Sequence, residues 1–206
     1  MEMKKAFYTY LEKIGKADER VIQQFEMYGQ LLIEENQKIN LFSRQMTAEE
    51  IWSVHFMDSI SLAEVYPNIS NEIILDFGTG GGLPGIPINI IFPENKLVFL
   101  DSKQKKMGSV KNICKKLDLK EVNFVCSRIE EIDSVWYGKF DRIVCRSVKI
   151  KPLYAQFLMK LLKKEGIINL YKAKQLDDVL LFKSYQIFNV SNEILGERRI
   201  VEIKHD

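Results

Sequence analysis

Apolar side chains in the first third of the chain recur at the spacing of amphipathic helices. Between residues 21 and 32 they stand three or four positions apart, which places them on one helix face, and Asp18 precedes them as a suitable N-cap. Thr47 and Glu50 then form a T-x-x-E capping box, so we expect another helix to begin there. Residues 1–68 are therefore predicted to form an N-terminal helical cap.

From residue 73 onward the pattern changes to short apolar runs separated by helical stretches, which predicts a parallel sheet covered by helices. The runs and helices occur in the order IILDF (73–77), PINIIF (87–92), KLVFLD (96–101), a lysine-rich helix, VNFVCS (122–127), FDRIVCRSV (140–148), a helix through 152–166, and IINLYK (167–172). Two final strands, at 184–195 and 198–204, are joined through Gly196 with no helix between them. They predict an antiparallel hairpin at one edge of the sheet.

Composition adds few constraints. Of the 206 residues, 46% are hydrophobic and 28% charged, an ordinary globular balance. The formal charge of +2 identifies no partner. Three scattered cysteines and two histidines do not have the spacing of a structural zinc site, so we expect no metal. The N-terminal residues lack the apolar core of a secretory signal, and no run approaches the ~18 apolar residues of a membrane span. We expect a cytoplasmic protein.

The segment IILDFGTGGGLPGIPI (73–88) satisfies two ligand fingerprints at once. Glycines 80, 82 and 85 spell the G-x-G-x-x-G of dinucleotide sites, whereas an aspartate at 76 with glycines 78, 80 and 82 spells an acid followed by G-x-G-x-G. Pro84 and Pro87 remove N–H groups from the start of the next helix, where a pyrophosphate needs donors. The dinucleotide fingerprint is therefore poorly met.

Asp76 points the same way, because a carboxylate at a strand end repels pyrophosphate and attracts an ammonium or sulfonium group. One such contact at about 4 Å is worth roughly 4 kcal/mol at an effective dielectric constant of about 20, before desolvation. S-adenosylmethionine carries both cations and an adenosine. The alternative for Asp76 is a carboxylate that braces the loop by accepting backbone N–H groups and never touches the ligand.

The following strand ends supply further candidates for this ligand. Asp101 ends the next strand and is placed to hold both ribose hydroxyls, a feature shared with nicotinamide sites. Ile129 and Glu130 follow the third strand, where they could meet the adenine edge, although an acid there is also favoured by a helix dipole. Arg146 ends the fourth strand and faces the crevice where open sheets bind ligands. Its alternative is a salt bridge between elements.

Seven motifs together resemble the RsmG/GidB family of methyltransferases, which modify N7 of a guanine in bacterial small-subunit ribosomal RNA. They are NQKINLFS (36–43), HFMDSI (55–60), DFGTGGGLPGIP (76–87), LDS (100–102), SRIEE (127–131), FDRIVCRSV (140–148) and LYKAK (170–174). The resemblance implies a Rossmann-like class I methyltransferase fold with a mostly parallel seven-stranded sheet. It also implies S-adenosylmethionine as cofactor, residues 69–206 as the domain that binds it, and 16S ribosomal RNA, naked or in the 30S subunit, as partner of a monomer.

By this resemblance Gly78, Gly80 and Leu83 belong to the cofactor loop with Asp76, and Asp101 holds the ribose. Ile129 and Glu130 border the adenine, and Arg146 lies where cofactor and acceptor meet. The chain departs from the family at Glu35, where a tryptophan usually precedes the asparagine, and in lacking a basic C-terminal tail. The first departure puts an N-terminal surface contact in question, and the second removes one RNA anchor.

Guanine N7 has an exposed lone pair and no proton to lose, so its methylation needs no general base, and we assign no catalytic residue. Arg146, Lys172 and His55 are the substrate candidates. His55 has a competing interpretation as part of a packed helix. The lysines between 103 and 116 are better explained as a solvated helix face than as an RNA track. Two alternative functions stay open here, an NAD(P)-dependent oxidoreductase and a non-catalytic ribosome-binding protein on the same fold.

Overall fold

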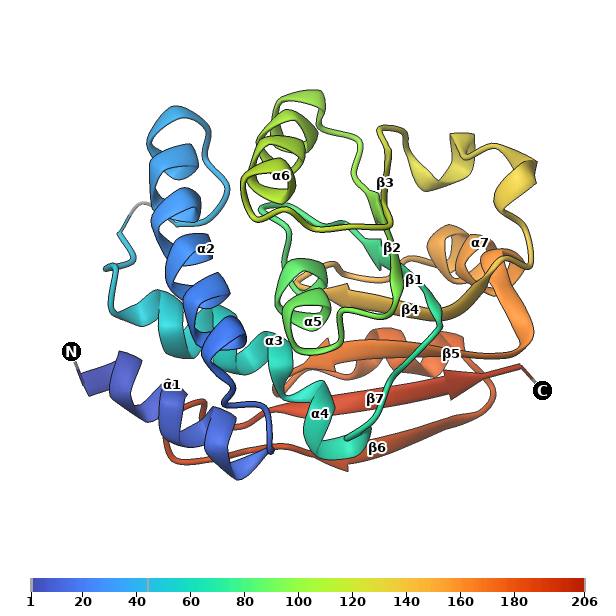
Figure 1. The fold of residues 1–206 in the computed structure, drawn as a ribbon. Helices are drawn as coiled ribbons and strands as arrows, with labels where there is room; N and C mark the ends of the chain where they lie inside the picture. The colour runs from blue at the N-terminus through green and yellow to red at the C-terminus, as the bar shows by residue number, and fades with distance from the viewer. Residues whose placement is uncertain (1, 44, 206) are drawn as a thin grey trace.

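The computed structural model describes residues 2–43 and 45–205. Residues 1 and 44 of the predicted helical cap (1–68) and residue 206 of the predicted cofactor domain (69–206) lie outside the described residues. In the described residues, seven strands form one sheet in the order β3-β2-β1-β4-β5-β7-β6 (Figure 1). They are β1 (Ile73–Phe77), β2 (Lys96–Leu100), β3 (Val122–Val125), β4 (Phe140–Arg146), β5 (Leu162–Lys172), β6 (Tyr185–Asn189) and β7 (Arg199–Lys204). Strands β1 to β5 are parallel, and β7 runs antiparallel to both β5 and β6. The predicted sheet and edge hairpin are confirmed.

Helices and helical turns cover this sheet. They are α1 (Glu2–Lys13), α2 (Glu19–Lys38), the π-helix η1 (Ile51–Met57), α3 (Asp58–Ile60), α4 (Leu62–Val65), α5 (Gly85–Ile91), α6 (Gln104–Lys116), the 3-10 turns η2 (Ile129–Glu131) and η3 (Ser134–Trp136), α7 (Pro152–Leu161) and the 3-10 turn η4 (Asp177–Leu181). Both predicted helix starts are present. The Asp18 carboxylate accepts the N–H of Val21, and the Glu50 N–H donates to Thr47 Oγ1 at 3.2 Å while the Thr47 N–H donates to Glu50 at 2.7 Å.

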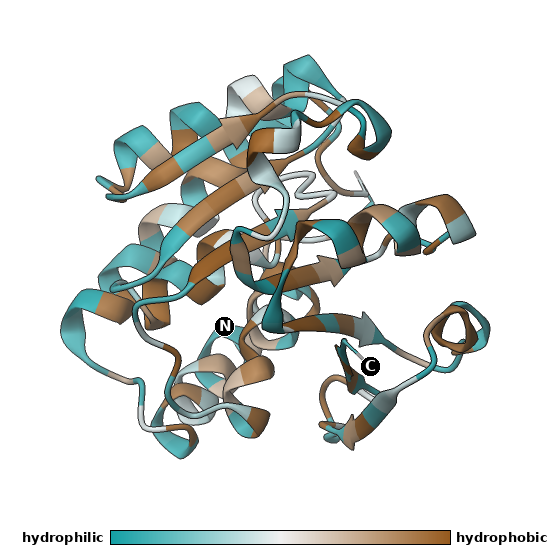
Figure 2. Cartoon of the chain, turned by 90° about the vertical axis from the view of Figure 1, so that its right-hand side faces the viewer, coloured by the Kyte–Doolittle hydropathy of each residue, from teal (hydrophilic) through white to brown (hydrophobic). Residues whose placement is uncertain are grey.

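Helix α5 shows that an apolar run reports burial rather than strand. Its residues include most of the run at 87–92, and every residue of the helix is buried. Helix α5 packs between the sheet and α2, so it has no solvent face and no amphipathic pattern. In Figure 2 the hydrophobic colour is concentrated on the strands and on the inner sides of the helices.

Two hydrophobic clusters lie on the two faces of the sheet. Ile74 packs in one cluster with the N-terminal helices, α5 and α6, and the next residue, Leu75, packs in the other with α7. This alternation follows from the two-residue period of a strand. The first cluster runs from Phe7 in α1 to Ile200 in β7 and crosses the predicted boundary at residues 68 and 69. That boundary therefore does not divide two separate cores.

The N-terminal helices contact the glycine-rich loop that follows β1. The Tyr28 hydroxyl in α2 donates to the Gly81 carbonyl at 3.0 Å, and a methyl group on Gly81 would lie 3.1 Å from Leu32. Among the described residues, no helix is both long and apolar enough to cross a membrane.

Candidate functional site

The loop after β1 turns sharply because three of its glycines adopt positive φ. Gly78, Gly80 and Gly82 have φ of 75°, 58° and 92°, a region that other residues rarely occupy. A Cβ on Gly78 would also lie 2.5 Å from Val148, in the segment after β4. The crowding of glycines in the sequence thus reflects both backbone conformation and close approach.

Asp76 lies beneath this loop and is fully buried. Its Oδ2 accepts the Thr79 hydroxyl at 2.7 Å and the Gly85 N–H at 3.0 Å, while Oδ1 is buried with no partner in the described residues. Burial raises the pKa of Asp76 to about 7, against the effect of the two hydrogen bonds. The geometry therefore supports the loop-bracing alternative, in which Asp76 shapes the loop without an exposed surface for a ligand.

A cavity of about 160 Å³ opens beside the loop at the ends of β1, β2 and β3. It brings together four residues predicted for the cofactor, namely Gly78, Asp101, Ile129 and Glu130. Its other lining residues are Phe77, Leu100, Ser102, Ser127, Arg128, Val148 and Tyr154. Convergence of these strand ends is what a parallel sheet with this order produces.

The polar groups of this cavity are only partly engaged. Asp101 Oδ2 accepts the Gly80 N–H at 3.1 Å and Oδ1 accepts the Lys103 N–H at 2.9 Å, so each oxygen keeps a lone pair for a ligand. The Ser127 hydroxyl is buried without a partner in the described residues. A ligand with hydroxyl or ring-nitrogen groups can satisfy such atoms.

Besides the buried Asp76, two predicted loop residues do not line this cavity. Gly80 serves it indirectly through its hydrogen bond to Asp101, and the Leu83 side chain packs in the hydrophobic cluster under the N-terminal helices. Sequence reasoning missed Tyr154, at the start of α7, whose ring meets Phe77 edge-on at 5.6 Å between centroids. Tyr154 lies in the first turn of the helix that follows β4, and this position could have indicated a residue beside the strand ends.

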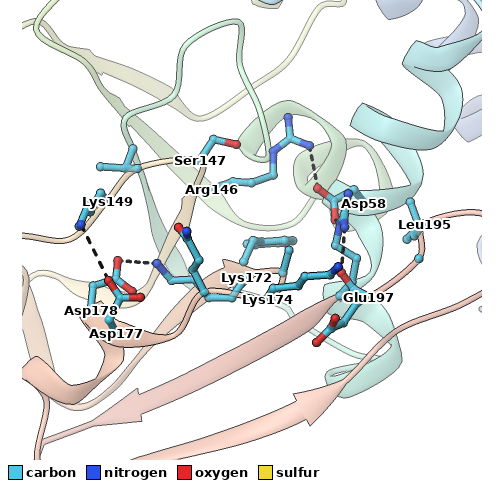
Figure 3. Close-up of a pocket in the computed structure, with 16 residues that line it drawn as sticks. Asp58, Arg146, Ser147, Lys149, Lys172, Lys174, Asp177, Asp178, Leu195 and Glu197 are labelled. Carbon is cyan, nitrogen blue, oxygen red and sulfur yellow. Dashed lines mark hydrogen bonds and ion pairs between the residues drawn. The ribbon is translucent and has the colours of Figure 1, made fainter.

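A larger cavity of about 840 Å³ lies at the ends of β4 and β5 (Figure 3). It is lined by Asp58, Arg146, Ser147, Val148, Lys149, Tyr171, Lys172, Ala173, Lys174, Gln175, Asp177, Asp178, Leu195, Gly196, Glu197 and Arg198. Val148 lines both cavities, which therefore adjoin. At the junction Ser147 adopts a φ of 59°, an uncommon conformation for a non-glycine residue.

Arg146 reaches this cavity but is engaged by the N-terminal helices. Its Nη1 donates to the Val54 carbonyl at 3.1 Å and to Asp58 Oδ2 at 3.0 Å, and its side chain is 9% exposed. Figure 3 shows Arg146 directed at Asp58. The salt bridge that the sequence left as an alternative is thus present, and the same guanidinium borders the cavity.

His55 supports Arg146 and lines neither cavity. Its Nδ1 lies 3.3 Å from Arg146 Nη2 and accepts from it, which puts the ring proton on the buried Nε2. Burial, and then the Arg146 charge, lower the pKa of His55 to about 3. The ring is neutral at physiological pH and buried, so the packed-helix interpretation of His55 fits better than substrate contact.

Lys172 forms part of the cavity wall as an ion pair. Its Nζ lies 2.5 Å from Asp178 Oδ2, which also accepts the Ile150 N–H at 2.8 Å, and both side chains are largely buried. The amine is therefore already neutralised. It fixes the segment after β4 and does not present a free charge to a phosphate.

Helix α6 carries the lysines on its solvent side, as expected, with Met107, Val110 and Cys114 buried on the other. Glu35 is buried where we expected a surface position. Its carboxylate accepts the Ser109 hydroxyl and the Asn112 amide, each at 2.8 Å, and so ties α2 to α6.

Known structures share this architecture at low identity, which establishes the fold alone. A predicted O-methyltransferase from Agrobacterium tumefaciens is 12% identical with a TM-score of 0.61, over 71% of this chain and 80% of that one. A putative S-adenosylmethionine-dependent methyltransferase from Methanococcus maripaludis is 17% identical with a TM-score of 0.58, over 76% and 90%.

Sequence relatives are closer. The Ribosomal RNA small subunit methyltransferase G of Acetivibrio thermocellus is 35% identical over 79% of this chain and 67% of its own length. The protein of the same name from Lactococcus lactis subsp. cremoris is 33% identical over 93% and 79%. The family model GidB, described as rRNA small subunit methyltransferase G, matches residues 21–194. With its fold, its loop and these matches in agreement, the chain belongs to the GidB family of small-subunit ribosomal RNA methyltransferases.

Proposed function

We propose that the protein transfers the methyl group of S-adenosylmethionine to N7 of a guanine in 16S ribosomal RNA. The observation that carries this proposal is the pair of adjoining cavities that meet at Val148. The smaller one is built from strand ends and has the polar groups that an adenosine needs. The larger one has room for a nucleotide and is lined by several cationic side chains.

The residues of the smaller cavity fit the cofactor. The free lone pairs of Asp101 suit the two ribose hydroxyls, and the Ser127 hydroxyl offers an unpaired polar atom to the adenine or ribose. Ile129 and Tyr154 supply apolar surface, and the absence of a Cβ on Gly78 leaves the loop backbone open to the ligand. Glu130 also lines the cavity. Asp76, Gly80 and Leu83 are proposed to act indirectly, by holding the loop in place through their hydrogen bonds and packing.

The chemistry at the larger cavity requires orientation rather than proton transfer. S-adenosylmethionine, when bound, supplies a methyl group on a positively charged sulfur. Guanine N7 accepts it without losing a proton. His55 and Cys145 are both unsuited to act as bases or nucleophiles, because burial lowers the pKa of His55 to about 3 and raises the pKa of Cys145 to about 12. Alignment of reactants can supply on the order of 7 kcal/mol or more.

Arg146 lines the larger cavity, two positions before the shared Val148, and is proposed to orient the acceptor. Its Nη1 and Nη2 are held by Asp58, His55 and the Val54 carbonyl, so the guanidinium is fixed before any ligand arrives. Such preorganisation limits the entropy lost on binding. Lys172, held by Asp178, is proposed to shape the cavity rather than to bind substrate.

Methyl incorporation into 16S ribosomal RNA from a bacterium that lacks this modification tests the proposal. We expect label at N7 of one guanine, with naked RNA and 30S particles compared as substrates, and loss of incorporation in Arg146→Ala. Lys105→Ala, an exposed change on α6, is the control and should keep full activity. Absence of incorporation into both substrates would leave a ribosome-binding protein, and calorimetric binding of NADH without S-adenosylmethionine would indicate an oxidoreductase.

Several narrower statements accompany this proposal. We propose that the protein acts in the cytoplasm, where its substrate is made. Recognition of the 30S particle and a monomeric state stay predictions, which the substrate comparison and light scattering can test. The division into a helical cap at 1–68 and a cofactor domain at 69–206 also stays a prediction, since one hydrophobic cluster spans both segments.

A further inference from the structure

Arg198 enters the larger cavity from the segment that precedes β7. Its Nε donates to Asp58 Oδ1 at 3.1 Å, and its Nη1 donates to the Glu197 carbonyl at 2.8 Å. Within residues 2–43 and 45–205, its Nη2 has no hydrogen-bond partner. The side chain is 27% exposed, so this nitrogen is available to a ligand in the cavity.

Asp58 holds two guanidinium groups at once. Its Oδ2 pairs with Arg146 at 3.0 Å and its Oδ1 pairs with Arg198, while its own side chain is only 10% exposed. One carboxylate between two arginines leaves one net positive charge in a partly desolvated wall. A charge in such a place attracts an anion more strongly than a fully solvated lysine does.

The other charges of the cavity are mostly paired. Lys172 is neutralised by Asp178, Lys149 lies 3.8 Å from Asp177, and Glu197 forms an ion pair with Arg199 outside the cavity. Lys174 is exposed on the same wall and adds positive charge. The net positive charge of the wall therefore comes from the partly buried pair of arginines held by Asp58 and from the solvated Lys174.

We propose that Arg198 contacts a phosphate of the RNA strand that delivers the guanine, and that Asp58 is the positioning residue that aims it. The inference rests on the proposed function. Of the two arginines, Arg146 has both terminal nitrogens engaged, whereas Arg198 has one free. A guanidinium with a free N–H suits a phosphate oxygen, and such contacts fix the register of the nucleic acid. The carboxylate of the cofactor is the other anion that Arg198 could bind, and measuring cofactor affinity distinguishes it from an RNA phosphate.

Arg198→Gln is the direct test, and Arg199→Gln is its matched control. The two arginines are neighbours with side chains 27% and 26% exposed, but only Arg198 lines the cavity. We expect Arg198→Gln to weaken binding to unmodified 16S ribosomal RNA roughly tenfold. The slope of log affinity against log salt should fall by about 1, because one phosphate contact is lost. Arg199→Gln should change both quantities little.

Cofactor affinity, measured by calorimetry, separates the two anions. It should be unchanged in Arg198→Gln; a loss of cofactor affinity with RNA binding intact overturns the proposal and assigns the cofactor carboxylate instead. Equal behaviour of the two glutamine variants also overturns it. If the wild-type protein transfers no methyl group, the proposed function is wrong. If the wild type is active but Arg198→Gln and Arg199→Gln behave alike, only the inference about Arg198 is wrong.

The role of Asp58 is tested by Asp58→Asn. We expect Asp58→Asn to raise the KM for RNA more when Arg198 is present than when it has been replaced by glutamine. In the Arg198→Gln background the side chain that Asp58 positions is already absent. An equal rise in both backgrounds contradicts a positioning role. Should Asp58→Asn fail to fold, the comparison of Arg198→Gln with Arg199→Gln decides the phosphate contact by itself.

Discussion

We predict that replacing the buried Asp76 by asparagine raises the stability of the protein above pH 7 and weakens its binding of the cofactor. Its pKa is raised to about 7 by burial, from an ordinary value of 3.8. Between these values the folded protein holds a proton that the unfolded chain releases, so the free energy of unfolding falls as pH rises. Asp76→Asn removes this titration and keeps an oxygen that can accept from Thr79 and Gly85.

The size of the effect follows from the two pKa values. Ionisation of the wild-type carboxyl lowers the free energy of unfolding by about 1.4 kcal/mol per pH unit, which amounts to about 4 kcal/mol by pH 7. The new amide nitrogen occupies the place of Oδ1, which has no partner in the described residues, and this costs about 1–3 kcal/mol at every pH. The variant should therefore match the wild type near pH 5 and exceed its stability by about 3 kcal/mol at pH 8.

Urea unfolding of both proteins between pH 5 and pH 8 measures this difference. It should change by about 3 kcal/mol across the range, and a difference that stays constant would refute the reasoning. Glu35→Gln is the control. Burial opposes ionisation of Glu35, but hydrogen bonds from Lys38 and from α6 outweigh it and lower its pKa, so its stabilising contribution is lost only as pH falls below about 4.5. Its difference from wild type should be flat above pH 5.

Cofactor affinity should move in the opposite direction to stability. Above pH 7 the wild-type Asp76 carries a negative charge beneath the loop, which favours a cationic ligand, and the asparagine variant does not. Calorimetry at pH 8 should show weaker binding of S-adenosylmethionine to the more stable protein. Equal affinity would mean that Asp76 acts through the loop geometry alone.

Two further substitutions test the packing around the site. Glu35→Ala leaves Ser109 and Asn112 without their hydrogen-bond acceptor and should lower the free energy of unfolding, measured with urea, by about 2–4 kcal/mol. Ser109→Ala added to that variant should then lower it little further. Gly78→Ala sets a methyl group 2.5 Å from Val148 at a positive φ and should cost about 1–3 kcal/mol and weaken cofactor binding. Gly108→Ala, on α6 with open space around it, should instead stabilise by about 0.5–1 kcal/mol.

The fold was predictable because its signals are local. Alternation of apolar runs with helical stretches identified the parallel strands, and the missing helix around Gly196 identified the antiparallel hairpin. Asp18 and the pair Thr47 and Glu50 marked helix starts within a few residues of their partners. The caps depend on contacts between near neighbours in the sequence, and the strands and helices are marked by the local spacing of their apolar residues, although the strands pair over long separations.

The site was predictable only as a set of strand ends. Gly78, Asp101 and Ile129 converge because parallel strands end at one edge of the sheet. The partners of the charged residues were not predictable, since Asp58 and Arg146 lie 88 positions apart and nothing local pairs them. The same holds for Glu35, whose partners on α6 lie more than 70 positions away. The spacing of residues can place a side chain at the edge of the sheet, but it does not identify the distant charged residue that pairs with that side chain.

The contact of Tyr28 and Leu32 with Gly81 makes the first third of the chain one wall of the glycine-rich loop. Any ligand that binds only the ordered loop stabilises the folded chain by mass action, and that stabilisation extends to α2. The N-terminal helices and the sheet should therefore unfold in a single cooperative transition. Protease cleavage within residues 19–38 would then report cofactor occupancy at a distance from the cofactor itself.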